Sequence, residues 1–300
     1  MINRIMKASG ASSYRHDLAR LNLSAVSDSV TEIHDVDYLG GLPERRLDVY
    51  YCDGALGVGD FGSSARGSAS MRPVLIDIHG GGFISYHKEF DRVYANVMAT
   101  RGFVVFEVDF RLAYPEYTVF DQIEDIDKAV RWIVNHASSY GGDVNRLYLG
   151  GHSSGCVLAV CEALLCLDLS MLSDFGFDAR NYSYSGLLLD CGLLHFYKKS
   201  IAYNGMRNMV FPSGYKDDKR FRYLVFENND SVRGLPRTAL ITNPKDVLRE
   251  MTYHFEGVLE KSGVEHRLFD RGSVGHTGIV FDPVRDGGEL VDGVVEYLKR

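Results

Sequence analysis

The chain has 300 residues, of which 45% are hydrophobic and 24% are charged, and its formal net charge is −7. Such a composition is ordinary for a globular protein with a large core, and the length suits one domain with room for a lid. The acidic balance, without a run of Lys or Arg, argues against nucleic-acid binding. No apolar run approaches the roughly 20 residues that a membrane span needs.

The N-terminal segment mixes charged and small residues and has no continuous apolar stretch. A secretory signal is therefore not expected, and a cytoplasmic location is the default prediction. A helix is expected over Tyr14–Leu23, and residues 1–30 would form an arm that either contributes to a cap over the active site or only supports the fold. The five cysteines are odd in number and lack Cys-x-x-Cys spacing, which predicts buried free thiols and no zinc site.

The first half of the chain opens with a predicted hairpin. Thr31–Leu39 and Arg46–Cys52 alternate apolar and polar residues around a glycine- and proline-containing break. The Gly-, Ser- and Ala-rich stretch Asp53–Met71 predicts a surface loop. Strands and helices then alternate: strand Pro73–Ile78, helix Asp91–Arg101, strand Phe103–Asp109, helix Ile123–Ala137 and a strand beginning at Leu147.

The second half continues this alternation after one interruption. We expect a helix from Ser154 to about Leu167, strands Tyr184–Cys191, Thr238–Thr242 and Glu265–Phe269, and helices Val247–Ser262 and Glu289–Leu298. Residues 193–235 break the rhythm and are rich in aromatic residues, which predicts a small cap insertion; extra peripheral helices are the alternative. The alternation predicts a single α/β domain over 1–300, with a mostly parallel twisted central sheet and helices on both faces.

The most informative stretch is Gly151-His152-Ser153-Ser154-Gly155, which follows the apolar strand at Leu147 and precedes a helix. A Gly-x-Ser-x-Gly sequence between a strand and a helix indicates a nucleophile elbow, in which the serine is lifted clear of the sheet edge. A second signal is the triple glycine in His79–Phe83, directly after a strand, which frees backbone N–H groups to face a ligand. Together they indicate nucleophilic catalysis by Ser153 with an oxyanion loop.

A nucleophilic serine needs a base and an acid, and both are expected beyond the carboxyl ends of the strands. His276 lies in a glycine-bracketed loop after the last strand, whereas His266 and His254 lie within a strand and a helix. His79 is expected to brace the glycine loop, and His152 to pack beside Ser153. Asp246 directly follows a strand and is the preferred acid; Glu250 and Asp270 remain alternatives.

Over residues 47–297 the chain resembles the hormone-sensitive-lipase-like carboxylesterases of the α/β-hydrolase superfamily, a group that borders kynurenine formamidases and feruloyl esterases. The resemblance rests on the following motifs: His79–Phe83, Asp109-Phe110-Arg111-Leu112-Ala113, Tyr140-Gly141-Gly142-Asp143, Gly151–Gly155, Asp246-Val247-Leu248 and His276. Three positions depart from the family pattern: Tyr114 interrupts the usual Ala-Pro-Glu run, Val247 replaces a proline after the acid, and Thr277 replaces an aromatic residue after the base.

The resemblance implies the α/β-hydrolase fold and a Ser153–His276–Asp246 triad that transfers an acyl group from an ester to water. It implies an oxyanion hole formed by the N–H groups of Gly81, Gly82 and Ser154, and no metal or organic cofactor. The candidate substrate-pocket residues are Phe83, Tyr86 and His152.

The partner implied by the resemblance is a small-molecule ester, and related enzymes are often homodimers. The leading hypothesis is a serine carboxylesterase for small to medium acyl esters. An arylformamidase or a feruloyl or acetyl-sugar esterase would use the same triad, and a hydrolase-fold protein that binds a ligand without turnover is the alternative from another class.

Overall fold

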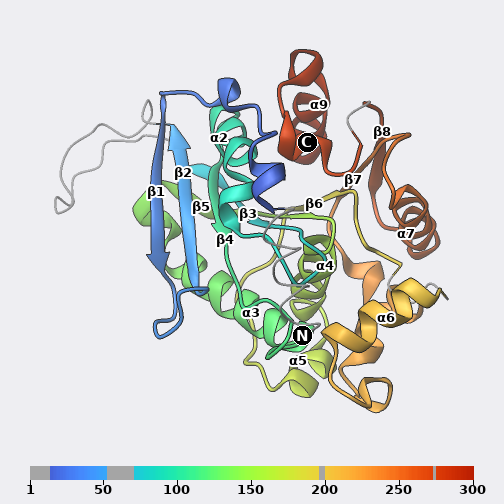
Figure 1. Cartoon of the computed structure of the whole chain (residues 1–300). Coiled ribbons are helices and arrows are strands. Elements are labelled where there is room, and N and C mark those ends of the chain that lie inside the picture. The colour runs from blue at the N-terminus through green and yellow to red at the C-terminus, as the bar shows by residue number, and fades with distance from the viewer. Residues whose placement is uncertain (1–13, 53–70, 196–199, 273–274) are drawn as a thin grey trace.

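The computed structural model describes residues 14–52, 71–195, 200–272 and 275–300, and its centre is one eight-stranded sheet (Figure 1). The strands run in the order β1-β2-β4-β3-β5-β6-β7-β8. Their bounds are β1 (Val30–Asp37), β2 (Arg46–Cys52), β3 (Arg72–Ile78), β4 (Val104–Val108), β5 (Gly142–His152), β6 (Gly186–Asp190), β7 (Thr238–Thr242) and β8 (His266–Asp270).

The sheet is antiparallel at one edge and parallel elsewhere. β1 pairs with β2 and β2 with β4 in antiparallel register, which confirms the predicted hairpin. All pairs from β4 through β3, β5, β6 and β7 to β8 are parallel, as the alternation of strands and helices predicted. β1 lies at one side of the molecule, and β8 lies at the opposite side (Figure 1).

Helices connect the strands and cover both faces of the sheet (Figure 1). The α-helices with defined bounds are α2 (Arg92–Thr100), α3 (Val119–His136), α4 (Gly155–Leu165), α5 (Leu169–Phe175), α6 (Ile201–Val210), α7 (Arg249–Ser262), α8 (Gly278–Phe281) and α9 (Glu289–Lys299). Apolar residues of α2 and α9 pack on one face of the sheet, and those of α3, α4 and α7 pack on the other.

Strand alternation sorts side chains between these two layers. In β3, Val74, Ile76 and Ile78 belong to the core cluster with α3 and α4, whereas Leu75 belongs to the cluster with α2. Because successive side chains of a strand point to opposite faces, Asp77 shares the face of Leu75. That parity places a buried carboxylate in the layer between the sheet and α2, where apolar residues would be expected.

Several boundaries differ from the sequence-based prediction. α3 begins at Val119 rather than Ile123, because Thr118 and Asp121 form a capping box that starts the helix early. α5 was not predicted; its N-terminus is capped by Asp168, whose side chain accepts from Ser170 N and Met171 N. The predicted surface loop at 53–71 falls almost wholly outside the described residues.

Two segments border the carboxyl edge of the sheet. Residues 201–235 form α6 and a series of short 3₁₀ helices, and residues 14–18 are helical. The N-terminal segment is tied to the core by the hydrogen bonds Asn22 N→Phe281 O and Asn22 Nδ2→Asp282 Oδ1, both 2.8 Å. The assignment of these two segments to a cap stays a prediction.

Among the described residues, no single helix is both long and apolar enough to cross a membrane. The consecutive helices α4 and α5 meet the length and composition test only as a pair bent by 113°. Every residue of α4 is buried in the fold.

Candidate active site

Three predicted residues lie within hydrogen-bond distance of one another at the carboxyl edge of the sheet. His276 Nε2 is 2.9 Å from Ser153 Oγ, and His276 Nδ1 is 2.7 Å from Asp246 Oδ1. Ser153 follows β5, Asp246 follows β7, and His276 lies in the loop after β8. A serine hydroxyl, an imidazole and a carboxylate in this sequence of contacts form the geometry of a nucleophile, its base and an orienting acid.

The Asp246 carboxylate is held by two more donors besides His276. Thr242 Oγ1 donates to Oδ2 over 2.8 Å, and the backbone N–H of Leu248 donates to Oδ1 over 2.9 Å. Burial raises the pKa of Asp246, but the hydrogen bonds from His276, Leu248 and Thr242 outweigh it and hold the pKa below its ordinary value. The carboxylate is therefore charged near neutral pH and can stabilise a protonated His276.

Ser153 has the strained backbone expected of an elbow. Its φ is +53°, in the left-handed region that costs a non-glycine residue about 1–3 kcal/mol. Two hydrogen bonds hold it there, from Ser153 N to Asp190 O and from Leu193 N to Ser153 O, both 2.9 Å. A Cβ at Gly155 would lie 2.1 Å from Ile78 O, so a glycine is required where α4 passes β3.

The glycine loop after β3 faces the same hydroxyl. A Cβ at Gly80 would lie 3.1 Å from Ser153 Cβ, and one at Gly81 only 1.8 Å from Ser85 O. Gly81 and Gly82 have φ values of +103° and +62°, which favour glycine. Among the described residues, no recorded hydrogen bond uses the N–H of Gly81, Gly82 or Ser154 as its donor.

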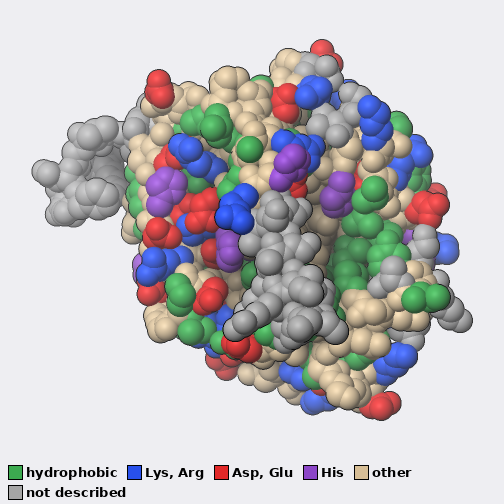
Figure 2. Space-filling model, in the orientation of Figure 1, with side chains coloured by type: hydrophobic (Ala, Val, Ile, Leu, Met, Phe, Trp, Pro, Cys, Tyr) green, Lys and Arg blue, Asp and Glu red, His purple; other side chains and the backbone are tan. Residues whose placement is uncertain are grey.

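A cavity of about 330 Å³ opens onto this constellation. Tyr86 lines the cavity together with Ser153 and His276. Its hydroxyl donates a hydrogen bond to Asp17 Oδ2 of the N-terminal segment. Its full lining is Asp17, Arg20, Gly80, Gly81, Gly82, Tyr86, Phe90, His152, Ser153, His276, Thr277 and Phe281. On the face seen in Figure 2, hydrophobic side chains gather in a hollow, with histidine side chains above it.

Comparison with known proteins agrees with this geometry. The BD-FAE family model matches residues 63–183. Over 98% of the chain, the fold superposes on 91% of esterase B from Lactobacillus rhamnosis, with a TM-score of 0.81 at 23% identity. It also matches a bacterial heroin esterase, with a TM-score of 0.70, 22% identity, and coverage of 99% of this chain and 90% of that chain. The chain has the fold of these esterases, the α/β-hydrolase fold.

Curated relatives of this chain include plant methylesterases. An isoprenylcysteine alpha-carbonyl methylesterase of Arabidopsis thaliana is 30% identical over 276 residues, covering 86% of this chain and 60% of the relative. A probable isoprenylcysteine alpha-carbonyl methylesterase of Oryza sativa subsp. japonica is 27% identical over 280 residues, covering 86% and 61%. The chain thus spans about three fifths of the length of these relatives.

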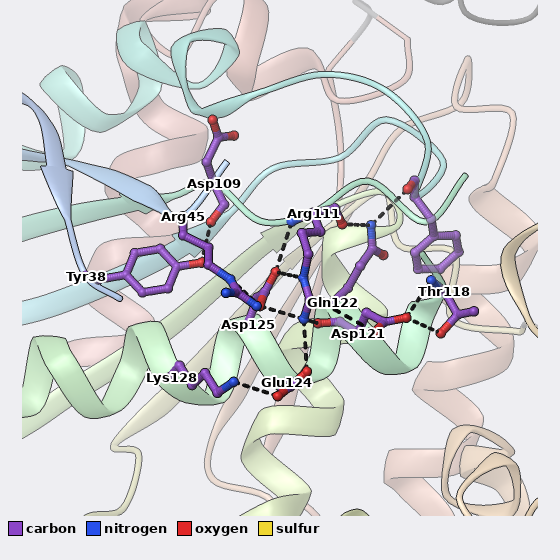
Figure 3. Close-up of polar contacts among 11 residues, drawn as sticks. Tyr38, Arg45, Asp109, Arg111, Thr118, Asp121, Gln122, Glu124, Asp125 and Lys128 are labelled. Carbon is purple, nitrogen blue, oxygen red and sulfur yellow. Dashed lines mark hydrogen bonds and ion pairs between the residues drawn. The ribbon is translucent and has the colours of Figure 1, made fainter. Parts of the chain in front are cut away.

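The glycine loop is braced by the loop after β4 and by α3 (Figure 3). Gln122 Nε2 on α3 donates to Phe83 O over 2.8 Å and to Arg111 O over 2.9 Å. The Arg111 guanidinium donates to both oxygens of the buried Asp125, over 2.7 and 2.8 Å. The motif containing Arg111 therefore holds the glycine loop from behind. No sequence motif pointed to Gln122, which lies on the buried side of α3.

Two of the three predicted pocket side chains do not face the cavity. The Phe83 ring is buried in the main apolar core, and Phe83 is not among the residues that line this cavity. The His152 imidazole is 1% exposed and points into the fold, although the residue borders the cavity. Both residues lie beside the active site, but strand and loop geometry turns their side chains inward. Of the three residues, Tyr86 and His152 border the cavity and Phe83 does not, and a role in binding substrate stays a prediction.

His152 instead belongs to a buried polar cluster between the sheet and α2. Its Nε2 is 3.0 Å from Asp77 Oδ2, and its Nδ1 is 3.0 Å from Asp190 Oδ2. Asp91 and Glu107 complete the cluster, which is fully buried. Burial alone would lower the pKa of His152, but the carboxylates Asp77, Asp91 and Asp190 outweigh it and raise the pKa well above its ordinary value. Burial likewise raises the pKa of Asp91 and Glu107.

The competing sequence candidates lie in other contacts. Asp270 hydrogen-bonds Arg249 and Tyr253, and His266 Nδ1 contacts Val264 O at 2.8 Å. His79 Nδ1 is 2.8 Å from Gly80 O, and its ring stacks on Phe110 with centroids 4.3 Å apart. These contacts fit the expectation that His79 braces the glycine loop.

The five cysteines are free, and three of them are fully buried: Cys156, Cys161 and Cys191. Burial raises the pKa of each of these three thiols. Raised values disfavour the thiolate that reacts and binds metals, in line with the sequence expectation of inert buried thiols.

Proposed function

We propose that the protein is a serine carboxylesterase that hydrolyses small to medium acyl esters. The observation that carries the proposal is the contact of His276 Nε2 with Ser153 Oγ at 2.9 Å, with Asp246 Oδ1 2.7 Å from the other ring nitrogen. Structural relatives with this fold include a form of esterase B inhibited by a tributyrin phosphonate.

In the proposed reaction, Ser153 Oγ attacks the ester carbonyl while His276 Nε2 accepts the hydroxyl proton. The oxyanion receives hydrogen bonds from the N–H groups of Gly81, Gly82 and Ser154, and each such donor is worth about 10²–10³ in rate. His276 then protonates the leaving alcohol. Water next loses a proton to His276 as it attacks the acyl-enzyme, which releases the acid and restores the serine hydroxyl.

The N-terminal segment and residues 193–235 are proposed to form the cap over this site. Asp17 and Arg20 line the catalytic cavity, and the Arg20 guanidinium lies 4.2 Å above the Phe281 ring. These contacts support a role for residues 1–30 in closing the mouth of the cavity. A cytoplasmic location and a homodimer also stay proposals; light scattering on the purified protein tests the dimer.

The test is turnover of p-nitrophenyl acetate and butyrate by the wild type, Ser153→Ala and the control Ser170→Ala. Ser170 lies on the exposed side of α5. Turnover and labelling by a fluorophosphonate probe should disappear in Ser153→Ala and persist in Ser170→Ala. Unchanged turnover in Ser153→Ala would remove the proposal, and a folded wild type that neither turns over esters nor takes the label would favour a ligand-binding protein.

The methyl ester of a prenylated cysteine is a second candidate substrate. The similarity of the chain to plant isoprenylcysteine alpha-carbonyl methylesterases favours it. A substrate panel of this methyl ester, p-nitrophenyl esters, an arylformamide and feruloyl and acetyl-sugar esters, ranked by kcat/KM, separates the alternatives. A preference of at least tenfold for the prenylcysteine methyl ester would move it to first place.

A further inference from the structure

A second group of side chains converges away from the triad. His195 follows β6, His254 lies on α7, and Glu227 lies on the 3₁₀ helix Phe226–Asn228. The imidazoles of His195 and His254 stack with centroids 3.6 Å apart and planes 5° apart. The two carboxylate oxygens of Glu227 each face one ring: Oε1 is 3.8 Å from His195 Nε2, and Oε2 is 3.9 Å from His254 Nε2.

These separations are too long for hydrogen bonds, which join N–H and O atoms at 2.7–3.2 Å. They are close to the span of one metal ion, because two ligand atoms at about 2.0–2.2 Å from a tetrahedral Zn²⁺ lie roughly 3.4 Å apart. A small movement of the side chains would bring them onto one ion. The ligand atoms of the three residues all lie within 4.8 Å of one another. We propose that His195, Glu227 and His254 form a binding site for a divalent transition-metal ion, with Zn²⁺ the best match to two imidazoles and one carboxylate.

The electrostatics of the group favour a cation. The stacked imidazoles present two ring nitrogens to the Glu227 carboxylate, and neutral imidazole is the form that binds metals. Within the described part of the chain, the recorded ion pairs of Glu227 are with these two histidines and with no Lys or Arg. An ion at this position receives two neutral nitrogens and one negative charge.

Packing beside the group holds the backbone that carries two of the three side chains. Phe226, which precedes Glu227, and Phe255, which follows His254, are both buried and contact each other edge to face at 5.6 Å. His254 Nε2 is shielded from solvent and makes no hydrogen bond within the described residues. The three side chains are nevertheless 24–32% exposed, so an ion can enter and keep a water as its fourth ligand.

Such an ion would act as a clamp between segments far apart in the sequence. It would join the segment 201–235, the loop after β6 and helix α7, which begins three residues after Asp246. Metal binding would therefore raise thermal stability, because a ligand that binds only the folded state stabilises it increasingly as the free ligand concentration exceeds Kd.

The experiment uses protein dialysed against EDTA and then titrated with Zn²⁺ alone, followed by calorimetry and thermal unfolding. The wild type should bind one ion at this site, and its Tm should rise with Zn²⁺ concentration. In Glu227→Gln and in His254→Gln the affinity for Zn²⁺ should fall sharply. Loss of an outer-shell contact costs about 10–100-fold, and loss of a direct ligand should cost more. His136→Gln, which changes an exposed histidine of α3, is the matched control and should respond as the wild type does.

Two further readouts locate the ion independently of folding defects. Co²⁺ should give the visible d–d absorption of a four-coordinate site in the wild type and in His136→Gln, and not in Glu227→Gln. The Zn²⁺-induced rise in Tm should shrink when the pH is lowered from 7.5 to 5.5, because the imidazoles must be deprotonated to bind. Equal Tm rises in the wild type and Glu227→Gln, or no binding at all, would overturn the proposal. If Zn²⁺ abolished ester turnover equally in the wild type and in Glu227→Gln, the ion would lie at the catalytic histidine instead. That result would also overturn the proposal.

Discussion

Two histidines flank Ser153 and make the same kinds of contact with different consequences. His276 joins one carboxylate to the serine hydroxyl, and its side chain is 31% exposed. His152 joins two carboxylates, Asp77 and Asp190, and its side chain is 1% exposed. A proton held between two buried carboxylates is hard to remove, whereas His276 contacts a single carboxylate and the serine hydroxyl. Burial and the number of carboxylates, rather than proximity to the nucleophile, thus decide which imidazole can serve as the base.

The largest expected effect follows from removing the base. His276→Gln should lower kcat for p-nitrophenyl butyrate by about 10⁶, the scale measured when a triad histidine is lost. Asp246→Asn should lower kcat by about 10⁴, because the imidazole loses its orienting partner. Steady-state kinetics on both variants test this, with circular dichroism to verify folding. Retention of most activity in His276→Gln would contradict the division of roles between the two histidines.

Removing the buried histidine should act on stability instead. His152→Phe leaves Asp77 and Asp190 without their cationic partner, and breaking a buried pair in this way costs about 3–5 kcal/mol of unfolding free energy. This loss of unfolding free energy should be smaller at pH 5 than at pH 8, because protonation of an unpaired buried carboxylate, which removes its charge, is easier at low pH. Urea denaturation at both pH values measures it.

His136→Phe changes an exposed histidine that stacks on Trp132, and it should stay within about 0.5 kcal/mol of the wild type. If His152→Phe kept full stability but lost turnover, His152 would belong with the catalytic group and the comparison would fail.

The contact behind the glycine loop should have an intermediate effect. Gln122→Met keeps the approximate volume but removes the donor to Phe83 O and Arg111 O, at a cost of about 1–3 kcal/mol. We expect kcat to fall by up to about tenfold, since the oxyanion donors are displaced but not deleted. Unfolding free energy and kcat are measured on the same preparation; an unchanged kcat would show that Ala113 N, which also donates to Phe83 O, suffices.

The smallest effect concerns a partly exposed histidine beside the glycine loop. The contact with Asp109 raises the pKa of His87, more strongly than burial lowers it. The stabilisation is therefore complete below the ordinary histidine pKa of about 6.5 and is lost as the pH rises through the raised value. Since the side chain is 39% exposed, solvent screening keeps the contribution below about 1 kcal/mol. His87→Gln should remove this part of the pH dependence between pH 6 and 8, and an unaltered slope would argue against the pair.

Much of the fold could be predicted because its signals are local. The hairpin, the order of strands and helices, and the exact bounds of β2 and β7 follow from alternation and from turn residues. The motif spacing also selected Ser153, Asp246 and His276, which the fold brings together. Their roles, and those of the oxyanion donors, stay proposals until the variants are measured.

What could not be predicted depends on contacts between distant segments. The contacts of His152 with Asp77 and Asp190 cannot be predicted from the local sequence, because these two residues lie on other strands, β3 and β6. Gln122 is likewise indistinguishable from any polar residue of a helix until α3 is packed against the glycine loop. The direction of the Phe83 side chain depends on its positive φ of 70°, which a single sequence does not encode for a non-glycine residue.

The order of the strands has a practical consequence for storage and heating. Ser153 leaves β5 in the interior of the sheet, whereas His276 follows β8, one of its two edge strands. Peripheral strands open with less free energy than central ones. Warmed preparations should therefore lose turnover, and regain it on cooling, at temperatures where the tryptophan signal of Trp132 on α3 still reports an intact interior.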